Sequence, residues 1–128
     1  MNAAGFLAVG AGAAVGAWLR WWLSVLLNPI LPAMPLGTLA ANLVGGYLMG
    51  VAMGVVQHAQ LLSPELRLLV TTGFLGGLTT FSAFSGEAAA LLGQQQYGWF
   101  AALIGAHVLG SILLTIAGIV TVRLALGF

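Results

Sequence analysis

The sequence contains no cysteine and no lysine, and only 4% of its 128 residues are charged. Without cysteine, the chain has no disulfides and no thiolate chemistry. The charged side chains are Arg20, Arg67, Arg123, Glu65 and Glu87. Because soluble domains carry about 25% charged residues, this composition excludes a soluble domain. A nucleic-acid partner is not expected either, since it would require a basic patch.

Hydrophobic residues make up 61% of the chain instead. A membrane-spanning helix needs about 20 apolar residues, and in lipid the backbone must satisfy its own hydrogen bonds. The apolar runs cover residues 4–27, 36–56, 66–92 and 98–125. We therefore predict an all-α integral membrane protein with four transmembrane helices in one transmembrane domain, residues 1–128. The expected location is the inner or plasma membrane, which the chain crosses several times.

The third apolar run has a clear start signal. Ser63 can cap the helix, Pro64 suits the first helical position, and Glu65 lies near the positive end of the helix dipole. The first apolar run lacks a basic leader and a clear cleavage site, so we interpret it as a mature helix rather than a signal peptide.

The middle of the third run is unusual for a membrane helix. Gly76 and Gly77 are adjacent, and each costs a helix about 1 kcal/mol relative to alanine. Thr79 and Thr80 follow, and their hydroxyls can satisfy backbone groups locally where a helix opens. We predict a helix break near residues 76–80, whose freed carbonyl oxygens would suit a hard monovalent or divalent cation. The alternative is a simple glycine kink.

Two phenylalanines follow this segment. Phe81 and Phe84 are three residues apart and share a helix face, with Thr80, Ser82 and Ser85 on neighbouring faces. The edge of an aromatic ring is electropositive, so ring edges could contact a passing anion without holding it firmly. The alternative is ordinary core packing.

Other spans contribute further polar groups. Thr38 and Asn42 lie one turn apart in the second run, and a buried Asn in a membrane is either helix glue or a site. His107, Ser111 and Thr115 recur every fourth residue and form a polar stripe along the fourth run. This stripe could line a pathway, or it could be a hydrogen-bonded seam between helices.

The charges bear on assembly. With four spans, the termini and the 57–65 connector share one side, and two of the three arginines lie near it. Such a weak bias permits insertion in both orientations. Four short helices enclose a solute poorly, so we expect an antiparallel homodimer. The sequence contains no Ser–His–Asp order, no metal-ligand cluster and no phosphate loop, so we do not expect an enzyme. The function that remains, given the polar groups of the spans, is a pathway for a small anion.

Three stretches of the chain resemble the CrcB/Fluc family of fluoride ion channels. GGLTTFSAFSGE (76–87) resembles the family signature, and GTLAANLVGG (37–46) is similar to its second-helix motif, with Asn42 at the characteristic Asn. GAWLRWW (16–22) resembles the first-helix motif, with Arg20 at the expected Arg. The chain length and the four-span layout also agree, so the resemblance covers nearly the whole chain.

The resemblance implies a dual-topology, antiparallel homodimer with two pores, through which cytoplasmic fluoride leaves passively, giving fluoride resistance. In this family Asn42 would donate to the anion, Phe81 and Phe84 would form an aromatic box, and Ser111 and Thr115 would continue a polar track. His107 departs from the smaller polar side chains that are usual at its position. The expected pathway residues are Arg20, Thr38, Asn42, Thr80, Phe81, Ser82, Phe84, His107, Ser111 and Thr115.

The resemblance also implies a structural sodium ion at the centre of the dimer. The backbone carbonyls of Gly76 and Thr79 would hold it, by their positions in the motif. Oxygen-only coordination suits a hard cation.

Two other functions remain to be weighed. A small multidrug-resistance-type antiporter also has four helices, but it needs a carboxylate deep in the first span, where this chain has Arg20 and no acid. A non-transporting scaffold subunit would explain the abundant glycines but not the polar stripe.

Overall fold

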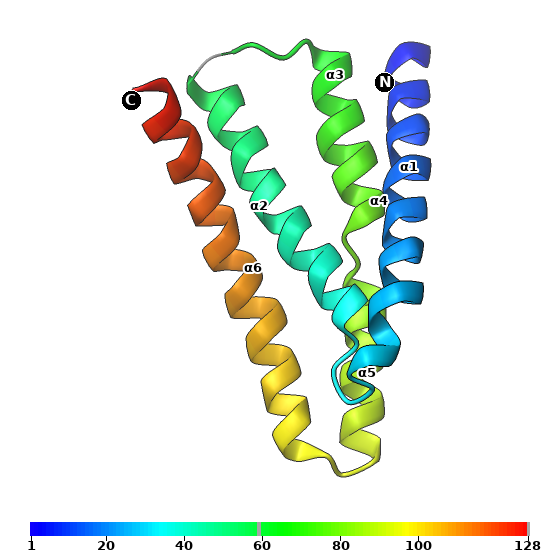
Figure 1. Cartoon of the computed structure of the whole chain (residues 1–128). Helices are drawn as coiled ribbons and strands as arrows, with labels where there is room; N and C mark the ends of the chain where they lie inside the picture. The colour runs from blue at the N-terminus through cyan, green and yellow to red at the C-terminus, as the bar shows by residue number, and fades with distance from the viewer. Residues whose placement is uncertain (59, 128) are drawn as a thin grey trace.

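The computed structural model describes residues 1–58 and 60–127; Ala59, in the 57–65 connector, and Phe128 lie outside the described residues. The described residues form helices joined by short connections (Figure 1). In chain order these are α1 (Ala3–Leu27), the 3-10 turn η1 (Asn28–Ile30), α2 (Leu36–His58), α3 (Pro64–Leu68), the π-helix η2 (Leu69–Leu75), α4 (Gly76–Leu78), α5 (Phe81–Gly93) and α6 (Tyr97–Leu126).

Four stretches are long and apolar enough to cross a membrane, as the sequence predicted. They are Ala3–Ile30, Leu36–His58, Pro64–Gly93 and Tyr97–Leu126. The described ends of the chain and the α2–α3 connection lie at one end of the molecule, and the α1–α2 and α5–α6 connections lie at the other (Figure 1).

The predicted start of the third span is confirmed. Pro64 is the first residue of α3, and Glu65 lies in its first turn. The Leu66 N–H donates to Ser63 Oγ over 3.2 Å, which satisfies one of the N–H groups that the first helical turn leaves without a partner.

Glycine lets the helix backbones approach closely. α2 packs chiefly on α6, and α1 packs on η2 and α4. A Cβ added at Gly50 would lie 2.0 Å from the Thr115 carbonyl oxygen, and one at Gly16 would lie 2.1 Å from that of Phe74. Both distances are far below van der Waals contact, so these crossings require glycine.

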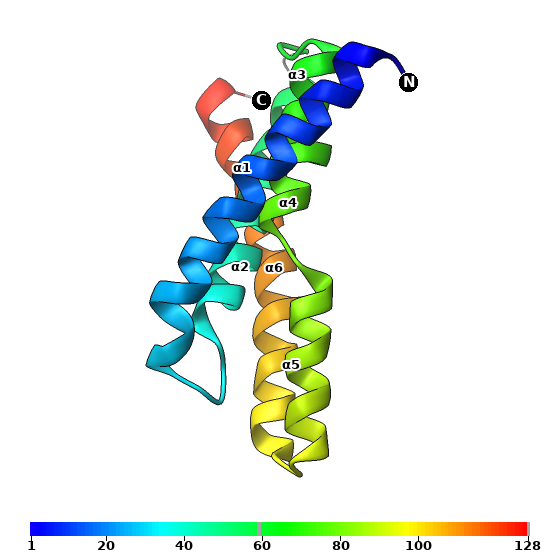
Figure 2. The ribbon, with the colours of Figure 1, turned by 90° about the vertical axis from the view of Figure 1, so that its right-hand side faces the viewer.

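The third span is not one continuous α-helix. η2 is a seven-residue π-helix, which the sequence analysis did not predict. After α4, Thr79 (ψ 154°) and Thr80 (φ −149°, ψ 113°) are extended, and α5 begins at Phe81. Figure 2 shows this extended link between α4 and α5, below which α5 lies beside α6. The link brings its backbone groups to α2, where the candidate site lies.

Two glycines of α1 test the close packing. A Cβ at Gly12 would lie 2.3 Å from the Leu69 carbonyl oxygen, whereas one at Gly10 meets nothing within 4 Å. We expect Gly12→Ala to lower the free energy of unfolding by about 1–3 kcal/mol through overpacking. Gly10→Ala, the matched control, should be neutral or stabilising by up to about 1 kcal/mol, from helix propensity. Equal unfolding temperatures of the two variants in detergent would contradict this packing.

Candidate functional site

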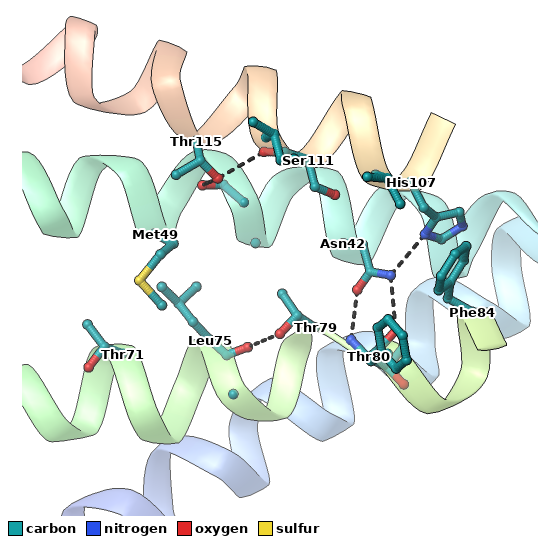
Figure 3. A pocket seen from close by; sticks show the side chains of 16 residues that line it. Asn42, Met49, Thr71, Leu75, Thr79, Thr80, Phe84, His107, Ser111 and Thr115 are labelled. Atoms are coloured by element: carbon teal, nitrogen blue, oxygen red, sulfur yellow. Dashed lines mark hydrogen bonds between the residues drawn. The ribbon is translucent and has the colours of Figure 1, made fainter. Parts of the chain in front are cut away.

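The extended link is held by the side chain of Asn42, from α2. The Thr80 N–H donates to Asn42 Oδ1 over 2.7 Å, and Asn42 Nδ2 donates back to the Thr80 carbonyl over 3.0 Å (Figure 3). A backbone that has left the helix must find such partners in a membrane. Asn42 thus joins α2 to the extended link, as helix glue would.

His107, from α6, occupies the other side of Asn42. Its Nδ1 lies 3.0 Å from Asn42 Nδ2, and its ring stacks on Phe84 with centroids 4.7 Å apart. The side chain is only 4% exposed. Figure 3 shows Asn42 between the Thr80 backbone on one side and the imidazole on the other.

These groups line a cavity of about 460 Å³ that is open on one side. Seven expected pathway residues line it: Asn42, Thr80, Phe81, Phe84, His107, Ser111 and Thr115. The expected cation residues Gly76 and Thr79 line it as well. Its walls therefore combine the extended link, the phenylalanine pair and the polar stripe, and they include no Arg, Lys, Asp or Glu.

Phe81 and Phe84 both line the cavity, but they differ in burial. The ring centroids are 5.6 Å apart and the ring planes meet at 66°, so one edge faces the other ring. Phe84 is 8% exposed and packs in a core with Met34, Ala88 and Leu103, whereas Phe81 is 78% exposed. The alternative interpretation, ordinary core packing, therefore describes Phe84 but not Phe81.

The polar stripe on α6 divides into bonded and free groups. The Thr115 hydroxyl lies 3.0 Å from the Gly46 carbonyl of α2 and 2.9 Å from the Ser111 carbonyl, and its one hydrogen serves these acceptors. His107 and Thr115 thus both join α6 to α2, as a helix–helix seam would. The Ser111 hydroxyl has no hydrogen-bond partner among the described residues, and it is the free donor of the stripe.

Three expected pathway residues lie outside the cavity lining. The Thr38 hydroxyl donates to Glu87 Oε1 over 2.6 Å, and the Ser82 hydroxyl lies 3.3 Å from that of Thr80. Arg20 Nε donates to the Gly77 carbonyl over 3.1 Å and so contacts α4 from the α1 side.

Sequence reasoning missed two features of this region. One is the pairing of Thr38 with Glu87, whose only signal was a carboxylate inside a membrane span. The other is Thr71 of η2, which also lines the cavity.

The carbonyls of Gly76 and Thr79 are among those that the extended link leaves without their helical donors. The Gly76 carbonyl would accept from the Thr80 N–H in a continuous helix, but that N–H donates to Asn42. The Thr79 carbonyl would accept from the Ala83 N–H, which donates to Thr80 Oγ1 over 3.1 Å. Within residues 1–58 and 60–127, no group of three His, Cys, Asp or Glu side chains could hold a metal ion.

Comparison with known proteins confirms the resemblance found in the motifs. The model of the family described as CrcB-like protein, Camphor Resistance (CrcB), matches residues 7–119. A protein of Ralstonia pickettii named fluoride-specific ion channel FluC is 61% identical over 125 residues, 96% of this chain and 98% of the relative. Proteins with the same name from Cupriavidus taiwanensis and Nitrosospira multiformis are 59% and 58% identical, over 97% and 91% of this chain and 98% and 91% of their own lengths.

The pairing of Asn42 with Thr80 is tested by Asn42→Asp. The carboxylate keeps the acceptor for the Thr80 N–H but sets an oxygen against the Thr80 carbonyl. We expect the free energy of unfolding to fall by about 1–3 kcal/mol. Ser82→Ala, which removes a neighbouring hydroxyl that holds no backbone group, is the control and should unfold like the wild type. An unchanged denaturation midpoint for Asn42→Asp would show that the pairing does not stabilise the protein.

Proposed function

The chain belongs to the CrcB family, and on that premise we propose that it is a fluoride-specific ion channel through which cytoplasmic fluoride leaves the cell passively. The observation that carries the proposal is the cavity beside the extended link, which has polar groups in a mainly apolar lining and is lined by no Arg, Lys, Asp or Glu. The membrane is the cell's inner or plasma membrane, and the cellular effect is resistance to fluoride.

The chemistry of fluoride explains why neutral groups line the cavity. Fluoride is small and strongly hydrated, so a pore must replace its water with successive donors. Permeation also requires several weak sites rather than one tight site, because the ion must leave again. The free Ser111 hydroxyl and the Phe81 ring edge are such donors, and so is the Asn42 amide once it gives up one of its two hydrogen bonds.

Passive flow is enough for detoxification. Hydrogen fluoride is a weak acid that crosses membranes as the neutral molecule and dissociates inside, which traps the anion. A channel lets the anion leave along its electrochemical gradient, and it is not an enzyme. Family membership also removes the antiporter and the scaffold as alternatives.

The working unit we propose is an antiparallel homodimer. The cavity is open on one side, and the ring of Phe81 on its rim is 78% exposed. A Cβ added at Gly76 would have only the Thr71 carbonyl oxygen nearby, at 3.8 Å, so this face of α4 is uncovered in one protomer. A second copy would close the cavity, and the weak arginine bias permits its opposite orientation.

A structural sodium ion fits the same face. Gly76 and Thr79 line the open cavity, and their carbonyls have lost their helical donors. Each copy would supply these two oxygens where the copies meet. Calcium takes about 6–8 oxygen ligands, and no carboxylate of the cavity lining could balance a double charge. A monovalent cation would therefore hold the two copies together without being transported.

Fluoride efflux from liposomes tests the proposed function. We expect Phe81→Ile to slow efflux by roughly two- to tenfold, because it removes a ring edge worth about 0.5–1.5 kcal/mol. Stability should change little, since Phe81 is exposed in the protomer. Phe84→Ile should lower both flux and stability, because Phe84 is also packed in the core. Wild-type vesicles that release no more fluoride than protein-free vesicles would overturn the proposal.

Engineered charge tests the antiparallel dimer. Replacing Gln94, Gln95 and Gln96 with lysine should fix one orientation, because lysine-rich loops stay in the cytoplasm. This variant alone should then fail to form the active dimer. Its counterpart carries lysine at Gln57 and Gln60, at the opposite end, and co-expression of the two should restore dimers and efflux. Full activity of either variant by itself would argue for a parallel arrangement.

A further inference from the structure

The orientation of the Asn42 amide is fixed by the backbone it holds. The Thr80 N–H is a donor only, so the Asn42 atom 2.7 Å from it must be the oxygen. The other end of the amide is therefore the NH₂ group. One of its hydrogens goes to the Thr80 carbonyl at 3.0 Å, and the second points to His107 Nδ1 at 3.0 Å.

This orientation also fixes the state of His107. A nitrogen that receives a hydrogen bond carries no proton itself, so Nδ1 is the acceptor and the proton of the neutral ring lies on Nε2. Nε2 is buried and has no hydrogen-bond partner among the residues that the structure describes. The imidazole is thus held by one hydrogen bond and by its stacking on Phe84.

Both donor hydrogens of Asn42 are therefore occupied in the protomer. Releasing the Thr80 carbonyl would leave a backbone group unpaired inside a membrane span, which costs several kcal/mol in lipid. Releasing His107 gives up one neutral hydrogen bond and leaves the link intact. Of the two hydrogens, the one directed at His107 is the one an anion can take.

We propose that His107 is a positioning residue that holds this Asn42 hydrogen until fluoride replaces the imidazole as its acceptor. The inference rests on the proposed function and deepens it. His107 and the anion compete for one donor, so each fluoride ion displaces a bond that re-forms when the ion moves on. The competition weakens the site, and a weak site is what rapid permeation requires.

Two substitutions of His107 separate the effect of its Nδ1 acceptor from the effect of its aromatic ring. His107→Phe keeps an aromatic ring against Phe84 and removes the Nδ1 acceptor. His107→Asn places a carbonyl oxygen near the position of Nδ1 and removes the ring. Both are compared with the wild type in liposomes, by measuring fluoride flux over a range of fluoride concentrations so that the half-saturating concentration and the maximum flux are obtained separately.

We expect His107→Phe to lower the half-saturating fluoride concentration by about two- to tenfold, the worth of one neutral hydrogen bond, without raising the maximum flux. His107→Asn should stay near the wild-type half-saturating concentration even though its maximum flux falls with the lost ring. An unchanged or higher half-saturating concentration in His107→Phe would overturn the inference. Absence of fluoride flux in the wild type would instead overturn the proposed function.

A spectroscopic measurement tests the same bond without transport. In ¹⁵N NMR spectra of histidine-labelled protein in lipid, the signals absent from His107→Phe belong to His107. We expect an unprotonated, hydrogen-bonded Nδ1 and a protonated Nε2, and addition of sodium fluoride should shift the Nδ1 signal while Nε2 stays protonated. A proton on Nδ1 before fluoride is added, or a Nδ1 signal that fluoride leaves in place, would contradict the proposed exchange.

Discussion

The two hydrogen bonds between Asn42 and the Thr80 backbone are the interaction on which the rest of the site depends. In water, two extended residues between helices would need no such help. In lipid, an unpaired N–H or carbonyl costs several kcal/mol, so the link between α4 and α5 requires a partner of the same shape as a backbone amide. A single asparagine supplies that partner, and its remaining hydrogen is directed toward His107.

Several neighbouring features of the structure depend on this link. Because Asn42 takes the Thr80 N–H, the Gly76 carbonyl loses its helical donor, and Thr80 is free to cap α5 through the Ala83 N–H. The start of α5 at Phe81 places one phenylalanine in the core and the other on the open rim. Close glycine contacts of α1 with η2 and α4, and of α2 with α6, hold the surrounding helices near enough for these bonds to form. The link, the cavity and the open face therefore depend on one another.

Local sequence signals predicted much of this fold. The four apolar runs and the Ser63 cap depend on composition and on neighbouring residues, and both are confirmed. The partner of Asn42 could not be predicted in this way, because it is a backbone group 38 residues away. The pairing of Thr38 with Glu87 spans 49 residues, and no period or spacing connects them. The π-helix was missed because its residues, LVTTGFL, have no feature that distinguishes them from an α-helical span.

Amide hydrogen exchange of the wild-type protein in lipid tests the central interaction most directly. Thr80 is extended and has no helical acceptor, so its amide should exchange quickly unless Asn42 holds it. We expect the Thr80 amide to exchange as slowly as the amides within η2 and α5. Exchange at the rate of an unprotected peptide would show that Asn42 does not hold the link and would contradict the account of the site built on it.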